Sequence, residues 1–229
     1  RSYKGFNMKI VHISDTHGFH EGQCELWLKE IAEEHQPSVV IHSGDFMQHS
    51  MKYQDAEDFF KWFMGLPFEH KILVPGNHDR WCEQLENDDD LRHAVLPDGL
   101  HLLINESVEI EGVKFWGSPY TPEFFDWGFQ LYGADGYDLW NEIPDSTDVL
   151  ITHGPSMGVL DKLPTNESVG CPFLAQRIDE LDIKAHLFGH IHDAYGMNSE
   201  DYYIAVNSSL LDENYKVQNK PQLVSVKDK

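Results

Sequence analysis

Short apolar runs recur along this chain, and polar residues follow each of them. Five runs have the length and apolar composition of buried strands. These are residues 8–13, 39–42, 72–74, 149–152 and 185–188. Helical spacing of apolar residues occupies the stretches between several of them. Strands interleaved with helices are typical of an α/β fold.

Three helices are predicted from this spacing and from the residues at their ends. Residues 25–34 and 54–64 each have one apolar face, and Pro37 and Gly65 suit their ends. A third helix should begin at Pro172, because proline is favoured at the first helical position. The aromatic stripe of residues 54–64 is interpreted as core packing rather than as a ligand site.

The remaining segments carry weaker patterns. Residues 100–104, 107–110 and 113–116 have strand periodicity and short polar turns, which predict the antiparallel part of a sheet. Residues 202–206 should form a last strand. The acidic run 86–90 is expected to be a solvated turn.

An aromatic flank spans residues 118–147, where eight large aromatic side chains are mixed with acidic residues and glycines. One interpretation is a loop-rich segment packed by its own rings. The alternative is a cap whose rings stack on a nucleobase or aryl group of a substrate. The sequence leaves both interpretations open.

The residues that follow the five strands are those of a metal or catalytic site. In α/β sheets, ligands bind beyond the carboxyl ends of the strands. Those loops carry Asp, Asn and His side chains, and no Cys. Such a set suits Mn, Fe, Zn, Co or Ni. Beside them, His78 can carry a proton and Asp79 can fix its tautomer. The candidate ligands are Asp15, His17, Asp45, Asn77, His153, His190 and His192.

The order of these motifs resembles a known family. Asp-x-His at Asp15, Gly-Asp at Asp45, Gly-Asn-His-Asp at Asn77, His-Gly at His153 and Gly-His-x-His at His190 look like the calcineurin-like metallophosphoesterase superfamily. Further motifs narrow the likeness to the branch of metallophosphoesterase-domain proteins, close to the class III cyclic-nucleotide phosphodiesterases: Gly117-Ser118-Pro119, Thr152-His153-Gly154-Pro155, Gly170-Cys171 and Asn207-Ser208. The resemblance implies a four-layer α-β-β-α sandwich of two mixed sheets with flanking helices.

The resemblance also implies a role for each candidate residue. Two divalent or transition-metal ions would share Asp45 as a bridge, and a hydroxide held between them would attack phosphorus. His78 would protonate the leaving oxygen or stabilise the phosphoryl charge, and Asp79 would orient it. The first ion would be held by Asp15, His17 and His192, and the second by Asn77, His153 and His190.

A departure from the superfamily points to the substrate. Its Ser/Thr protein phosphatases have arginines after Gly-Asp and before Gly-Asn-His. Here Phe46-Met47-Gln48 follows Asp45, and Pro75 precedes Gly76. Without such positive forks, a small phosphodiester is favoured over a dianionic monoester, with cyclic nucleotides as plausible substrates. The alternatives are a phosphomonoesterase for small substrates and a non-catalytic binding or scaffold protein. The latter should lack ligands, and none is missing.

Composition limits the partners and the compartment. The 229 residues fit one domain, with residues 1–7 expected to be a vector remnant or a disordered end because residue 1 is not methionine. The formal net charge of −22 argues against a nucleic-acid polymer as partner. No apolar run reaches the roughly 20 residues of a membrane span. Three scattered cysteines read as reduced thiols, which predicts a cytoplasmic protein. The oligomeric state is left open.

Overall fold

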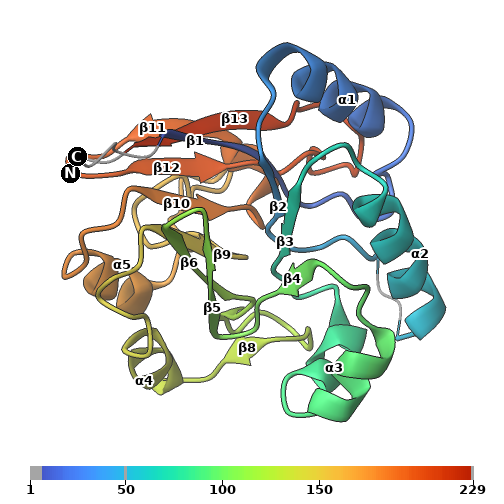
Figure 1. The fold of residues 1–229 in the computed structure, drawn as a ribbon. Helices are drawn as coiled ribbons and strands as arrows, with labels where there is room; N and C mark the ends of the chain where they lie inside the picture. The colour runs from blue at the N-terminus through green and yellow to red at the C-terminus, as the bar shows by residue number, and fades with distance from the viewer. Residues whose placement is uncertain (1–6, 49–50, 228–229) are drawn as a thin grey trace.

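Two large sheets face each other in the computed structural model, which describes residues 7–48 and 51–227 (Figure 1). The first sheet has the strand order β13-β1-β2-β3-β4. Four of its strands are parallel, and β13 pairs antiparallel with β1. The strands are β1 (Asn7–Ile13), β2 (Val39–His42), β3 (His70–Leu73), β4 (Leu100–Leu102) and β13 (Gln222–Lys227).

The second sheet has the order β11-β12-β10-β9-β6-β5. Its four inner strands are parallel, and each edge strand is antiparallel to its neighbour. The strands are β5 (Glu106–Ile110), β6 (Val113–Ser118), β9 (Val149–Thr152), β10 (Ala185–Phe188), β11 (Gly196–Ser199) and β12 (Ile204–Asn207). A small parallel pair, β7 (Thr121–Pro122) and β8 (Gln130–Leu131), lies in the segment after β6.

Helices cover the outer face of each sheet. α1 (Gln23–His35), α2 (Tyr53–Met64), η1 (Arg80–Leu85) and α3 (Asp89–Val95) belong with the first sheet. α4 (Asp135–Trp140) and α5 (Pro172–Ile178) pack against the second sheet, and η2 (His192–Ala194) follows β10. The predicted α-β-β-α order of two mixed sheets with flanking helices is therefore confirmed.

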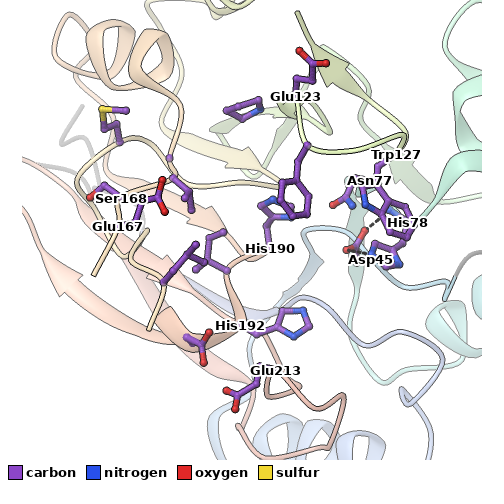
Figure 2. Close-up of a pocket in the computed structure, with 18 of the residues that line it drawn as sticks. Asp45, Asn77, His78, Glu123, Trp127, Glu167, Ser168, His190, His192 and Glu213 are labelled. Carbon is purple, nitrogen blue, oxygen red and sulfur yellow. Dashed lines mark hydrogen bonds and ion pairs between the residues drawn. The ribbon is translucent and has the colours of Figure 1, made fainter. Parts of the chain in front are cut away.

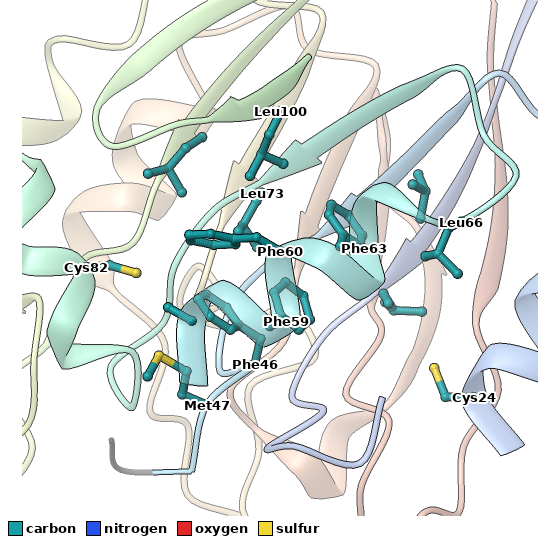
Figure 3. Close-up of a cluster of buried hydrophobic side chains, with 14 of the residues drawn as sticks. Cys24, Phe46, Met47, Phe59, Phe60, Phe63, Leu66, Leu73, Cys82 and Leu100 are labelled. Atoms are coloured by element: carbon teal, nitrogen blue, oxygen red, sulfur yellow. The ribbon is translucent and has the colours of Figure 1, made fainter. Parts of the chain in front are cut away.

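The alternation of side chains along each strand builds three apolar clusters. Val11 belongs to the cluster under α1 and α2, whereas Ile10 belongs to the cluster between the sheets. Figure 3 shows the first of these clusters, in which the rings of Phe46 and Phe59 stack with centroids 4.3 Å apart. Each fully buried Phe contributes about 1.5–3 kcal/mol by the loss of exposed apolar surface. The aromatic stripe of α2 is thus core, as expected.

Strand register fixes where the loops meet. Ile13 lies beside His42, and His42 lies beside Leu73, so β1, β2 and β3 end level with one another. The same holds in the second sheet, where Leu187 pairs with Ile151. The loops that follow these strands consequently gather at one edge of the two sheets.

Two sequence expectations were wrong in this region. The acidic run 86–90 is not a turn throughout, because the Asp88 side chain accepts the Leu91 N–H and caps α3. Residues 100–116 are not one antiparallel unit: β4 extends the first sheet in parallel, and only β5 and β6 form a hairpin, in the second sheet. The short β4 pairs with the free edge of β3 before the chain crosses over.

Most of the predicted amino-terminal segment 1–7 lies outside the described residues, and Asn7 is already the first residue of β1. The helices formed by the described residues are too short or too polar to cross a membrane.

Candidate metal centre

The loops after β1 and β2 lie side by side and carry strained backbone. The N–H of Asp15 donates to the carbonyl of Gly44, and the N–H of His17 donates to that of Asp45, both at 2.9 Å. Asp15, His17, Asp45 and His190 all have positive φ, between 41° and 69°. Left-handed backbone at such residues costs about 1–3 kcal/mol each and clusters at functional sites.

The first candidate ligand group joins both sheets. The ligand atoms of Asp15, His17 and His192 lie within 4.8 Å of one another. Asp15 Oδ2 accepts the N–H of His190 and the hydroxyl of Ser209, both at 2.9 Å, which leaves Oδ1 toward His192 Nε2 at 3.3 Å.

The second candidate group adjoins the first. Asp45, His153 and His190 also offer ligand atoms within 4.8 Å. His153 donates its Nδ1–H to the carbonyl of Ser43 at 2.9 Å, so Nε2 is turned into the site. That nitrogen lies 2.8 Å from Asn77 Oδ1 and 3.3 Å from Asp45 Oδ2. Three lone-pair atoms thus converge where a cation would neutralise them.

The electrostatics of the site suit a bound cation. Burial is the largest influence on the pKa of His153 and lowers it, but the charge and hydrogen bond of Asp45, the charge of Asp15 and the carbonyl of Ser43 together outweigh burial and raise the pKa to about 9. For His192 the carboxylate of Asp15 does the same, again to about 9. Burial alone would raise the pKa of Asp45, yet the surrounding imidazoles hold it well below its usual range.

Unsatisfied atoms point the same way. Within the described part of the chain, both ring nitrogens of His17 and Oδ1 of Asp15 are buried without a hydrogen-bond partner. Buried polar atoms of this kind are rare in native proteins unless an ion or water completes them. The donor set of carboxylates, imidazoles and one amide oxygen therefore fits two divalent ions.

Two glycines allow the ligand loops to approach this closely. A Cβ on Gly189 would lie 2.1 Å from Asp15 Oδ2, and a Cβ on Gly76 would lie 2.3 Å from Asp45 Oδ1. No side chain fits at these distances. Glycine at these two positions therefore lets the loop that carries His190 approach Asp15, and the loop that carries Asn77 approach Asp45.

The role expected of Asp79 needs correction. Its carboxylate accepts the N–H groups of Gly76 at 2.7 Å and of Asp45 and Met47 at 2.8 Å each. The ring of His78 is instead hydrogen bonded through Nδ1 to the carbonyl of Gln48. Asp79 therefore fastens the loop after β2 to the loop after β3, rather than orienting His78.

His78 reaches the site through its other nitrogen. Nε2 lies 3.9 Å from Asp45 Oδ2, and the backbone N–H of His78 donates to Asp45 Oδ1 at 2.8 Å. Figure 2 shows His78 beside Asp45 and Asn77, with Trp127 against its ring. The imidazole is placed beside both ligand groups, where a proton could be delivered.

A cavity of about 640 Å³ opens onto these groups. The aromatic flank supplies Phe124 and Trp127 to its wall, while the loop before α5 supplies Met157 and Leu163. The packing interpretation of the flank is confirmed for Phe129 and Trp140, which are buried in clusters of the core. Stacking of a flank ring on a substrate stays a prediction.

Supporting groups from the carboxyl-terminal loop were missed in the sequence. The carbonyl of Asp212 accepts the Nδ1–H of His192 at 3.0 Å, and the Tyr215 ring meets that of His17 at 4.9 Å. The motif Asn207-Ser208 at the end of β12 was the available signal for Ser209, the hydrogen-bond partner of Asp15.

Comparisons with known proteins agree with this geometry. Residues 8–194 match the family model of the calcineurin-like phosphoesterases. The human metallophosphoesterase domain-containing protein 1 is 32% identical over 212 residues, which cover 82% of this chain. The chain spans only 64% of that relative's length. A UPF0046 protein of Caenorhabditis elegans is 30% identical over 227 residues, or 93% of this chain and 73% of that protein.

Solved structures show the same fold at low identity. A dimetal phosphatase from Danio rerio has a TM-score of 0.55 at 10% identity, covering 87% of this chain and 86% of that one. A Thermus thermophilus protein has a TM-score of 0.61 at 17% identity, covering 96% and 98%.

Proposed function

The chain belongs to the calcineurin-like phosphoesterase family, and we propose that it hydrolyses small phosphodiesters with two metal ions. The observation that carries the proposal is the position of Asp45. Its Oδ2 lies within 3.9 Å of ring nitrogens of His17, His78 and His153. One carboxylate thus faces both ligand groups, as a bridge must.

We assign Asp15, His17 and His192 to one ion and Asn77, His153 and His190 to the other, with Asp45 shared. Such ions polarise a phosphoryl oxygen and lower the pKa of water at the site. The side chains of the protein must then hold the phosphate in line and supply a proton. We assign the proton to His78, whose Nε2 faces Asp45 while Nδ1 is held by Gln48.

The charge of the cavity supports a diester. Among the described residues that line it, five are acidic and none is Lys or Arg. The acidic residues are Asp45, Glu123, Glu167, Asp193 and Glu213. A diester has one negative charge and a monoester dianion has two, so this wall discriminates against the monoester. Cyclic nucleotides fit this class and are the substrates we would test first.

The free, buried thiols of Cys24, Cys82 and Cys171 support a cytoplasmic location for the protein. The proposed location and the proposed substrate are independent of each other.

The deciding experiment compares two substrates that share one leaving group. Protein reconstituted with Mn²⁺, Fe²⁺, Zn²⁺, Co²⁺ or Ni²⁺ is assayed on bis-p-nitrophenyl phosphate and on p-nitrophenyl phosphate. We expect a higher kcat/KM for the diester. A preference for the monoester of about tenfold, equivalent to about 1.4 kcal/mol of transition-state binding, would instead identify a phosphomonoesterase. Two bound metals per chain without any turnover would identify a binding protein.

A further inference from the structure

The ring of His78 is held from two directions. Its Nδ1 is hydrogen bonded to the carbonyl of Gln48, which fixes the position of that ring edge. The indole of Trp127 lies flat on the imidazole, with centroids 4.1 Å apart and an interplanar angle of 18°. A hydrogen bond at one nitrogen still allows the ring to tilt, and a stacked indole removes that freedom. Nε2 is thereby kept pointing at the metal centre.

The segment that carries Trp127 is fastened to the segment that carries His78. The N–H of Gly128 donates to the carbonyl of Asn77 at 3.0 Å, and the N–H of Phe129 donates to the carboxylate of Glu83 at 3.0 Å. On the other side of Trp127, Arg80 donates to the carbonyl of Asp126 at 3.2 Å.

The backbone of Gly128 also packs closely against the backbone of Asn77. A Cβ on Gly128 would lie 3.2 Å from the carbonyl oxygen of Asn77, so a larger residue there would push the two segments apart. These bonds reach from residues 126–129 to residues 77–83 on both sides of the indole. These hydrogen bonds therefore fix residues 126–129 of the flank in the position where Trp127 covers His78.

We propose that Trp127 is a positioning residue that acts through His78, holding the imidazole in the orientation from which it protonates the leaving oxygen. The proposal rests on the function assigned above. The face of Trp127 turned to His78 is occupied, so this ring serves the catalytic group rather than a nucleobase on that face.

The proposal separates substrates by their leaving group. An alkoxide needs a proton as the P–O bond breaks, because the electron pair of that bond would otherwise leave as a strong base. A p-nitrophenolate departs with the electron pair unprotonated. Loss of the Trp127 ring should therefore slow only the first kind of substrate. Three diesters test this: bis-p-nitrophenyl phosphate, glycerol 1,2-cyclic phosphate and adenosine 2′,3′-cyclic phosphate.

Trp127→Leu, Trp127→Phe and the control Phe125→Leu should be compared with the wild type, with bound metal measured in each. Phe125 belongs to the same flank, but 78% of it is exposed and it is not among the cavity-lining residues. For Trp127→Leu we expect kcat on both cyclic phosphates to fall about tenfold or more, with little change on the aryl ester. Trp127→Phe should restore much of the rate, and Phe125→Leu should match the wild type.

A double-mutant cycle with His78→Ala gives the decisive result. If Trp127 acts through His78, then Trp127→Leu should cause no further loss once His78 is alanine. Additive losses would overturn the proposal. So would a rise in KM confined to the adenosine substrate, which would identify a base-stacking platform. Equal losses on all three substrates, with lower metal content, would identify a purely structural role.

The wild type separates this proposal from the one on which it rests. If the metal-loaded wild type hydrolyses no diester, the proposed function fails. If it hydrolyses the aryl ester but neither cyclic phosphate, His78 protonates no leaving group, and the role of Trp127 falls with it. If all three are hydrolysed and the cycle is additive, only the role of Trp127 is wrong.

Discussion

Replacing Asp79 by Asn should loosen the loop that carries Asp45. The buried carboxylate accepts three short N–H hydrogen bonds, from Gly76 and Asp45 on one oxygen and from Met47 on the other. An amide has a single acceptor oxygen. If that oxygen accepts the N–H groups of Gly76 and Asp45, the amide NH₂ faces the N–H of Met47, and two donors then meet without an acceptor.

The magnitude follows from these contacts. A hydrogen bond to a charged group contributes about 1.5–3 kcal/mol, and a buried donor left unsatisfied costs about 1–3 kcal/mol. These two energies overlap, because both count the loss of the hydrogen bond from Met47. We therefore expect the free energy of unfolding of the metal-loaded protein to fall by about 3 kcal/mol. Burial and the charge of Asp45 raise the pKa of Asp79. Cations beside Asp45 oppose that rise and keep the carboxylate ionised.

Urea unfolding of metal-loaded protein, with bound metal measured in parallel, tests this prediction. Asp126→Asn is the matched control, because its side chain is 96% exposed and its loss should change stability by no more than about 0.5 kcal/mol. Asp79→Asn should lower both the unfolding free energy and the metal content. If both stay at wild-type values while only the leaving-group dependence changes, Asp79 orients His78 after all and the correction made above is wrong.

Three further predictions concern the site and the core. Asp45→Asn should lose at least one metal per chain and nearly all turnover, because the bridging charge is removed; two retained metals with wild-type rate, by elemental analysis and assay, would refute the bridge. Gly189→Ala should displace the Asp15 carboxylate, which a Cβ would meet at 2.1 Å. The unfolding free energy should fall by about 1–3 kcal/mol, and calorimetry should show weaker metal binding. Burial lowers the pKa of His186 from 6.5 to about 3, so its neutral form contributes stability above pH 6.5 that is lost as the pH falls toward 3. The loss reaches about 2.7 kcal/mol at pH 4.5, and urea unfolding of His186→Gln should show a correspondingly flatter fall between pH 7 and 4.5.

The parallel strands and the loops that follow them could be predicted from the sequence. Each parallel strand is an apolar run, and in a parallel sheet the carboxyl ends gather at one edge, so the side chains after those runs had to meet. That argument predicts that the side chains of five residues lie close together: Asp15, Asp45, Asn77, His153 and His190. The residue types of these motifs and their order along the chain then indicated the family.

What the sequence did not indicate depends on partners far along the chain. Strand periodicity shows that residues 100–102 are extended but not which sheet they join, because either edge offers unpaired N–H and C=O groups. The alternation Val224–Val226 in β13 is too short to predict a partner by itself. His78 and Asp79 are neighbours in sequence, yet Asp79 precedes η1, and its carboxylate turns back to the loop amides.

Both candidate ion sites draw on the two sheets, and this has a consequence for how the protein is made. Asp15, Asp45 and Asn77 leave the ribosome before His153, His190 and His192, and strand β13, which pairs with β1 and so secures the strand leading into Asp15, is synthesised after all of them. Neither candidate ion site has its full set of ligands until strands of both sheets have been synthesised. Metal loading therefore follows the synthesis of both halves of the fold, and the ions available at that stage decide which metals the protein acquires.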